Sequence, residues 1–422
     1  MKKSGNTFFA IAYLAMAIPM FYLSSQGFFI GSFGVEYKYL LGLGIIALAL
    51  LHFLISADLR SAIRCTKDAL VMARPYLWTL AYSLVFWVIS MAGFRVMTRG
   101  AAVIAYQLIA ILAAAGTLYM FGSKGVYMQI FALAAAMGLM VLQQIGQVGL
   151  GEFLKQYVES ISSFAANSGT AMRFFEKQGH TYATGFFLVY FILTMKEKRI
   201  NILWAAVTLL LFFLGLKRSV FLGIGVALIL GLLITRVRKP AKWVVPMAII
   251  GTGLTMAYIF WVYHGLFDWL ETIGITTSGR NWLYAQIKEF YHLSPAYFGK
   301  GAGFVSTAFG NGVFDVSEYG FTIGDIHNEY LRQYIEYGFW GFLVWIWLYT
   351  ASRVKHFFHQ GADAVENRHG VIAFALVMVN CVMFMTENSL YYFYTTMAMS
   401  TMIMGYHYED FVKRTRLPGE EK

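Results

Sequence analysis

Long apolar runs alternate with short polar segments along almost the whole chain. A run of about 20 apolar residues crosses a bilayer as a helix, because a helix satisfies its own backbone hydrogen bonds in lipid. The pattern therefore predicts an all-α polytopic membrane protein of about twelve spans. These are Thr7–Ser24, Tyr37–Ile55, Leu77–Ala92, Ala101–Phe121, Val126–Ile145, Thr181–Leu193, Ile200–Leu216, Ser219–Thr235, Trp243–Tyr263, Tyr334–Tyr349, Gly370–Thr386 and Leu390–Tyr406.

The composition supports a membrane protein. Hydrophobic residues make up 59% of the chain and charged residues 13%, whereas soluble domains carry about 25% charged residues. The excess apolar surface is expected to face lipid. The two cysteines, Cys65 in an expected cytoplasmic loop and Cys381 in a span, predict no disulfide framework. No cluster of metal ligands and no cofactor are expected.

The positive charge is distributed as in a membrane protein that follows the positive-inside rule. The net charge is +11, but most of the basic residues fall in alternate loops, such as the dense segment Arg236–Lys242. This places both termini in the cytoplasm. A lipid bilayer, and no nucleic acid, is the expected partner.

Five regions follow from this topology. Residues 1–145 hold the first five spans, 146–180 a small outer loop, 181–263 spans six to nine, 264–333 a large outer loop, and 334–422 the last three spans with a cytoplasmic tail. The two outer loops are too long and too mixed in composition for linkers. They are expected to form a folded, helical cap on the outer face.

Two arginines on the expected outer face, Arg218 and Arg280, are the first candidates for functional residues. Arg218 and the preceding Lys217 lie at an outer turn between spans seven and eight, where positive-inside bias disfavours basic residues. They either snorkel to lipid phosphates or bind an anionic ligand, since a guanidinium matches phosphate oxygens in pairs. Arg280 follows Ser278, the expected N-cap of a short helix. An arginine in a first helical turn opposes the helix dipole, and a bound anion would explain it.

Arg280 has a simpler alternative role, which is a salt bridge to Asp268 or Glu271.

A third candidate, His327, leads into the tenth span. Helical spacing would put Glu329, Arg332, Gln333 and Glu336 on one polar stripe and His327, Tyr330, Leu331 and Tyr334 on another face. A lone histidine is more often structural than catalytic, but two outer arginines lie nearby in the expected topology.

Three weaker features belong to the same outer face. Gly299–Gly303 has the glycine spacing of a phosphate loop, but follows no strand. It is expected only to line the cap flexibly. Arg173 lies in the smaller outer loop, and Glu387 lies between the last two spans, where an acid can pair with an arginine.

Together these residues resemble the O-antigen polymerase and ligase superfamily. The ligase-type signature His-[Asn/Ser/Gln]-x9-Gly-x-x-[Gly/Thr/Tyr] is met by His327, Asn328, Gly338 and Gly341. The flanking order is also similar: an arginine outside a central span, a Ser-Gly-Arg start to the large loop, then a glycine-rich stretch before the histidine. The resemblance covers roughly residues 150–390.

The resemblance implies a GT-C-like, metal-independent glycosyltransferase of the bacterial plasma membrane. Its partners would be an undecaprenyl-diphosphate-linked oligosaccharide donor, a glycan acceptor and, as a further candidate, a chain-length regulator. His327 would position or deprotonate the acceptor hydroxyl, oriented by Asp325 or Glu387, and Arg218 and Arg280 would bind the diphosphate. The expected substrate-binding residues are Arg173, Arg332, Lys217, Tyr330, Asn328 and Glu387.

Several functions stay open at this point. The string from Ile326 to Phe339 is more similar to polymerases of surface polysaccharide than to ligases that transfer glycan to lipid A-core. A lipid-linked oligosaccharide flippase is a competing hypothesis, opposed by the long outer loop and by the scarcity of charges within the spans. A non-catalytic scaffold of a glycan assembly complex is a third.

Overall fold

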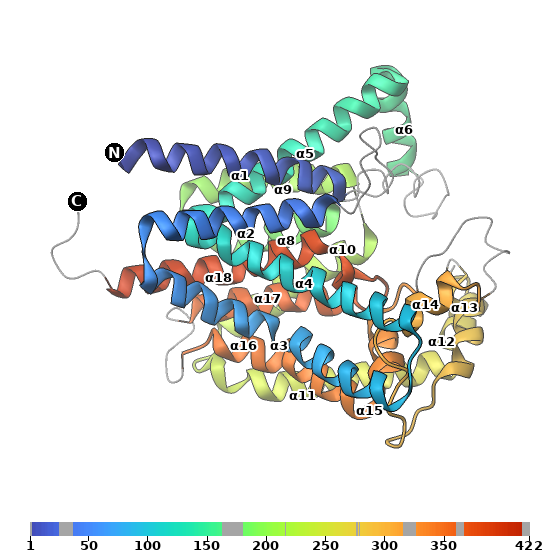
Figure 1. Cartoon of the computed structure of the whole chain (residues 1–422). Coiled ribbons are helices and arrows are strands. Elements are labelled where there is room, and N and C mark those ends of the chain that lie inside the picture. Colours follow the sequence, from blue (N-terminus) through green and yellow to red (C-terminus); the bar gives the residue numbers. More distant parts are fainter. Residues whose placement is uncertain are drawn as a thin grey trace.

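A computed structural model describes residues 2–24, 37–162, 180–215, 217–275, 277, 279–314, 326–359 and 367–415. The regular elements of these residues are all helical (Figure 1). The first half contains α1 (Lys2–Ser24), α2 (Tyr37–Ser56), α3 (Leu59–Ile89), α4 (Phe94–Phe121), α5 (Lys124–Val148), α6 (Leu150–Ser162), α8 (Thr181–Thr194) and α9 (Arg199–Gly215). The second half contains α10 (Arg218–Thr235), η1 (Pro240–Lys242), α11 (Val244–Tyr263), α12 (Leu266–Thr272), α13 (Arg280–Ile287), η2 (Lys288–Phe290), α14 (Phe304–Gly310), α15 (Glu329–Trp347), η4 (Leu348–Ser352), α16 (Arg353–His356), α17 (Arg368–Met383), η5 (Ser389–Tyr391) and α18 (Phe393–Thr415).

The chain is a multi-pass α-helical membrane protein. Among the described residues, seven helical segments are long and apolar enough to cross a membrane: α1 to α5, α10, and η1 together with α11. Three further apolar helices, α8, α9 and α17, are shorter. Each of the twelve stretches predicted from hydrophobicity coincides with a helix, although several boundaries differ.

Helix α3 differs most from its prediction. It begins at Leu59, about five turns before the apolar stretch, because Asp58 caps its first turn by accepting the Ser61 N–H at 3.1 Å. The same N–H lowers the pKa of the Asp58 carboxyl. Cys65, expected in a loop, is therefore buried on a helix. That prediction was wrong because a capped, charged segment can extend a helix beyond its apolar part.

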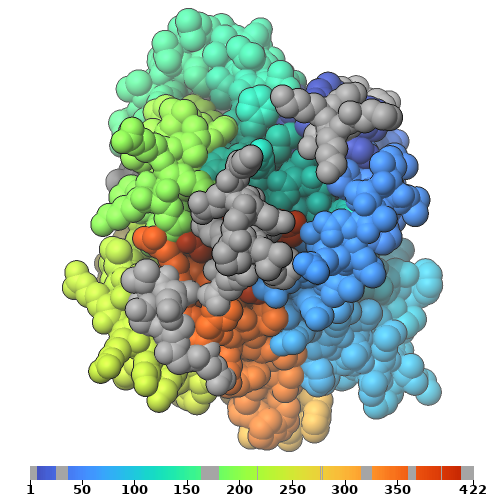
Figure 2. Space-filling model, turned by 90° about the vertical axis from the view of Figure 1, so that its left-hand side faces the viewer, coloured from blue at the N-terminus to red at the C-terminus, as the bar shows by residue number. Residues whose placement is uncertain are grey.

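The helices form a bundle with two distinct ends. The start of α1 and the end of α18, which are the described ends of the chain, lie at one end of the bundle, and α12, α13 and α14 lie at the other, where they form a cap (Figure 1). Viewed from the end that bears the start of α1 and the end of α18, the C-terminal helices occupy the centre, with blue N-terminal helices on one side and the green to yellow helices α9 to α11 on the other (Figure 2). The described part of the segment 264–333, predicted as a large outer loop with a helical cap, thus contains several short helices.

Burial follows this arrangement. Helices α8 and α17 are buried along nearly their whole length, and α17 packs against α10, α8 and α18. Peripheral helices instead expose large apolar side chains, such as Leu54 of α2, Leu210 of α9 and Leu254 of α11, which are 77%, 68% and 68% exposed. Surfaces this apolar are stable in contact with lipid.

A crossing of backbones joins the cap to helix α15. This helix is kinked at Gly338 (φ 66°, ψ −171°), and the segment 297–301 passes through the kink. The Lys300 N–H donates to the Ile335 carbonyl (2.9 Å), and the Phe339 N–H donates to the Tyr297 carbonyl (2.8 Å). The backbone groups freed by the kink are therefore paired, as burial requires.

The glycine-rich segment Gly299–Gly303 is built into this crossing. Gly299, Gly301 and Gly303 all have positive φ, which favours glycine. The N–H groups of Gly303 and Val305 both donate to the Glu336 carboxylate at 3.1 Å. The expectation of a flexible lining was wrong, because these backbone donors bind a carboxylate of the protein itself.

Gly338→Ala should destabilise the protein. A Cβ atom at this position would lie 2.3 Å from both the Tyr297 oxygen and the Phe298 carbonyl carbon, and the backbone conformation is nearly exclusive to glycine. We expect a loss of about 2–4 kcal/mol, measured by thermal unfolding in detergent. Gly251→Ala is the matched control, since nothing lies within 4 Å of its added Cβ. Equal unfolding temperatures for the two variants would contradict the close packing of the segment 297–301 against Gly338.

Candidate functional site

The turn after helix α17, residues 384–388, is the centre of the candidate site. Helix α17 ends at Met383, so the next carbonyl oxygens have no helical N–H to accept from. Three consecutive carbonyls of this turn accept from three different elements, α15, α11 and α13. The contacts are the Glu329 N–H to the Phe384 oxygen (2.8 Å), the Tyr258 hydroxyl to the Met385 oxygen (2.7 Å) and the Arg280 guanidinium to the Thr386 oxygen (3.0 Å).

The fourth residue of the 384–388 turn brings in the histidine. Glu387 Oε2 lies 4.0 Å from His327 Nδ1, and the side chains of the two residues are 15% and 41% exposed. This separation exceeds a hydrogen bond. It is short enough for the carboxylate to stabilise a protonated imidazole, and small movements on ligand binding commonly tighten such pairs. Of the two predicted orienting acids, Glu387 is therefore placed beside the histidine.

The first turn of helix α10 contacts the carboxylate of Glu387. The Ser219 hydroxyl donates to Glu387 Oε1 at 3.2 Å. Arg218 is the first residue of α10 and is exposed, and Lys217 is its N-cap residue and half-buried. The predicted Lys217–Arg218 pair is thus next in sequence to a residue that contacts Glu387.

Arg280 reaches the turn from the cap. Helix α13 starts at Arg280, one residue later than an N-cap at Ser278 predicts, because its N-cap is Gly279 with φ 75°. Ser278 lies outside the described residues. The Thr386 carbonyl continues the C-terminal end of α17, where the helix dipole favours a cation. This contact uses one of the five N–H donors of the guanidinium.

Glu271, an alternative partner for Arg280, is held by the loop. Its Oε1 accepts from the backbone N–H of Thr277 (2.7 Å) and from the Thr277 hydroxyl (2.5 Å). These bonds, the side-chain one first, lower the pKa of the Glu271 carboxyl. Thr277 is thereby held, and its carbonyl oxygen accepts the Arg280 N–H at 3.3 Å.

His327 is not part of the helix that follows it. Helix α15 begins at Glu329, and His327 has a positive φ of 49°, which is uncommon for a non-glycine residue. Asn328 is the N-cap, and its side-chain oxygen accepts the Leu331 N–H at 3.1 Å. The prediction that His327 and Tyr330 share a helical face was therefore wrong. Asn328 caps the N-terminus of α15, so the helix begins only after the histidine.

Three predicted substrate-binding residues make contacts with protein. Asn328 donates to the Tyr258 hydroxyl at 2.9 Å, and the Tyr330 hydroxyl donates to the Cys381 carbonyl at 2.8 Å. Arg332 lies 3.7 Å from Glu336 and also contacts Ser306. All three are at least 95% buried. Their observed contacts hold the start of α15 in place, and their binding of substrate stays a prediction.

Two of the predicted site residues cannot be placed, and three residues that were not predicted contact the site. Arg173 and Asp325 lie outside the described residues. Sequence reasoning did not single out Tyr258, Ser219 or Thr386, which the structure adds to the site. Nothing in their local sequence marks them, because a buried tyrosine, a serine after an arginine and a backbone carbonyl are common in any helical protein.

Comparison with models of known protein families and with characterised proteins found no match to this chain. The site must therefore be interpreted from its own chemistry. It combines an imidazole, a carboxylate and two guanidinium groups near the cap end of the bundle. An imidazole beside a carboxylate can accept a proton from a hydroxyl, and arginines can stabilise a phosphate leaving group.

Asn328→Ala should loosen the histidine segment. The variant loses the cap of α15 and leaves the Tyr258 hydroxyl without its donor, at a cost of about 1–2 kcal/mol. Asn328→Ser is the matched control, since its neutral hydroxyl oxygen can still cap the helix, and it should lose less. Thermal unfolding in detergent measures both. An alanine variant as stable as the wild type would show that this cap does not support the site.

Proposed function

We propose that this chain is a glycosyltransferase that polymerises the repeat units of a bacterial surface polysaccharide at the outer face of the plasma membrane. The observation that carries the proposal is the meeting of His327, Glu387 and Arg280 at the 384–388 turn, beside the start of α10. The donor would be an oligosaccharide on undecaprenyl diphosphate. The acceptor would be the terminal sugar of a second lipid-linked unit.

The proposed topology has twelve spans with both termini in the cytoplasm. The seven long apolar helices, the three shorter ones, the α15–α16 segment and α18 make up these spans. The position of both termini at one end of the bundle supports an even number of crossings (Figure 1). The cap, at the other end, then lies outside the cell, where lipid-linked glycans are assembled into polymer.

The reaction needs a base and a site for the leaving group. In the proposed step, the acceptor hydroxyl oxygen forms a bond to the anomeric carbon of the donor, and the bond from that carbon to the diphosphate oxygen breaks. His327 accepts the hydroxyl proton, and Glu387 stabilises the resulting imidazolium. The electron pair of the broken bond leaves with undecaprenyl diphosphate.

The two arginines would bind the diphosphate. Negative charge grows on its oxygens as the glycosidic bond breaks, and fixed guanidinium groups stabilise that charge without reorganising. Arg218 is exposed at the start of α10, where a lipid-linked substrate can approach, and Arg280 is half-buried in the cap. Lys217 adds a further positive charge beside Arg218.

Arg218→Ala, Arg280→Ala and His327→Ala should each lower glycan transfer at least about 100-fold, because each removes a charge or base used in the transition state. Transfer is measured with purified protein and a lipid-linked donor, and membrane insertion by fractionation. Arg95→Ala is the matched control, since Arg95 is an exposed arginine of α4 that contacts Asn311 instead of the 384–388 turn. Normal transfer by all three site variants would refute the proposal.

The acceptor can be identified by reconstitution with one substrate at a time. With the lipid-linked repeat unit alone, we expect a ladder of products that differ by one repeat, resolved by gel electrophoresis. Reaction only after addition of lipid A-core would instead identify a ligase that uses the same donor chemistry. Movement of the lipid-linked unit across vesicle membranes with no new glycosidic bond would identify a flippase.

A further inference from the structure

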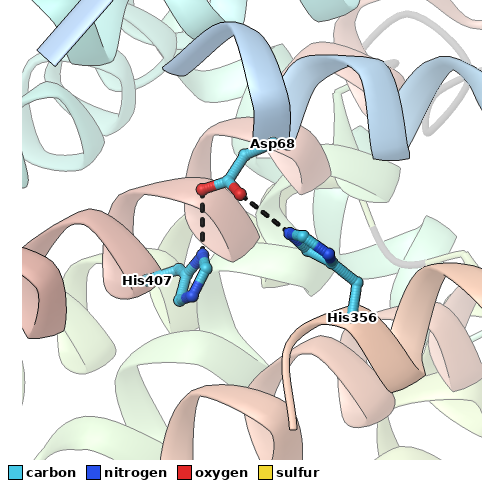
Figure 3. Close-up of side chains that lie close together, drawn as sticks. All are labelled: Asp68, His356 and His407. Carbon is cyan, nitrogen blue, oxygen red and sulfur yellow. Dashed lines mark hydrogen bonds and ion pairs between the residues drawn. The ribbon is translucent and has the colours of Figure 1, made fainter. Parts of the chain in front are cut away.

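A second cluster of polar side chains lies away from the 384–388 turn, among α3, α16 and α18. Asp68 Oδ1 lies 3.0 Å from His356 Nε2, and Asp68 Oδ2 lies 2.9 Å from His407 Nδ1 (Figure 3). One potential ligand atom from each of the three residues falls within 4.8 Å of the others. The sequence prediction of no metal-ligand cluster missed this group, because its members are 288 and 339 residues apart.

The cluster is enclosed but has an open side. The side chains of Asp68 and His407 are 2% and 5% exposed, whereas that of His356 is 31% exposed. An ion could therefore enter past His356 and reach a buried carboxylate. The His369 ring stacks on the His407 ring with their centroids 5.4 Å apart, which restrains the orientation of His407.

The donor set selects the class of ion. Two imidazole nitrogens and one carboxylate oxygen suit zinc and its neighbours, whereas magnesium and calcium prefer oxygen ligands alone. In tetrahedral zinc sites the ligand atoms lie about 3.3 Å apart, as metal–ligand bonds of about 2.0–2.2 Å require. The two short distances of the cluster are slightly below this value, and the three potential ligand atoms all lie within 4.8 Å of one another. The two contacts to Asp68 would therefore have to open as an ion entered between the side chains. Water could supply the fourth ligand.

Arg64 is the group that competes with such an ion. Its Nη2 lies 2.9 Å from His407 Nδ1, and its Nε lies 3.6 Å from Asp68 Oδ2. The Arg64 side chain is 27% exposed, so it can turn toward solvent when an ion takes its place. A positive charge this close would weaken metal binding for as long as it stays.

We propose that Asp68, His356 and His407 bind one divalent transition-metal ion, most suitably zinc. The site joins helices α3, α16 and α18, which come from distant parts of the chain. In the proposed topology it faces the cytoplasm. The ion would fasten the inner end of the bundle, on the side away from the candidate active site, and the proposal does not depend on the glycosyltransferase activity.

Zinc binding tests the site directly. Full-length protein without a polyhistidine tag is purified in detergent, incubated with zinc and passed through a metal-free desalting column. Elemental analysis should then find about one zinc per chain, and zinc should raise the unfolding temperature. Asp68→Asn and His407→Asn should each weaken binding at least about 100-fold, since loss of a ligand costs more than loss of a supporting group. His264→Asn is the matched control, since His264 is an exposed histidine that follows α11 and is not part of the cluster.

Arg64→Gln separates a metal site from a hydrogen-bond network. If the cluster binds zinc, removal of the competing charge should tighten binding at least about tenfold. If the cluster is only a network, Arg64→Gln should lower the unfolding temperature without zinc and add no zinc binding. Wild-type protein that holds no zinc after desalting would overturn the proposal. So would zinc binding of equal strength in Asp68→Asn, His407→Asn and the wild type.

Discussion

The candidate site depends on one constraint, which is that the carbonyl oxygens just after helix α17 need hydrogen-bond donors from outside that helix. A buried helix end must find hydrogen-bond donors outside its own helix. Here the donors come from α11, α13 and α15, and the adjacent Glu387 contacts the first turn of α10. Four other helices thus converge on one turn of the chain. Arg280 and His327 are brought to the same place as a result of this backbone pairing.

A second constraint acts on helix α15, which follows the cap in the sequence and connects it to the bundle. The kink at Gly338 frees backbone groups that the segment 297–301 satisfies, and Glu336 pairs with the N–H groups that follow that segment. The first glycine of the signature, Gly338, is therefore explained by close contact between two backbones. The start of α15, with its buried Arg332 and Asn328, is held rigidly behind His327. A base that must meet a substrate hydroxyl benefits from such support.

The two ends of the bundle have different chemistry. The cap end holds guanidinium groups and an imidazole near a carboxylate, which suits an anionic, phosphate-bearing ligand. The end with the termini holds a carboxylate between two imidazoles, which suits a cation (Figure 3). A largely apolar helical bundle lies between them, with C-terminal helices at its centre (Figure 2). Helix α17 begins near the histidine cluster with His369 and ends at the candidate active site.

The sequence by itself determined the helices, the membrane environment and the candidates His327, Arg280, Arg218 and Glu387. Hydrophobic runs report burial in lipid directly, and an arginine that opposes the positive-inside rule is visible without any structure. Only the tertiary structure decided which polar groups meet. It paired Glu387 with His327, turned Arg332 and Tyr330 toward protein, and joined Asp68 to two distant histidines. Local patterns fix which face of a helix is apolar, but contacts between distant residues depend on how the helix ends and kinks are satisfied.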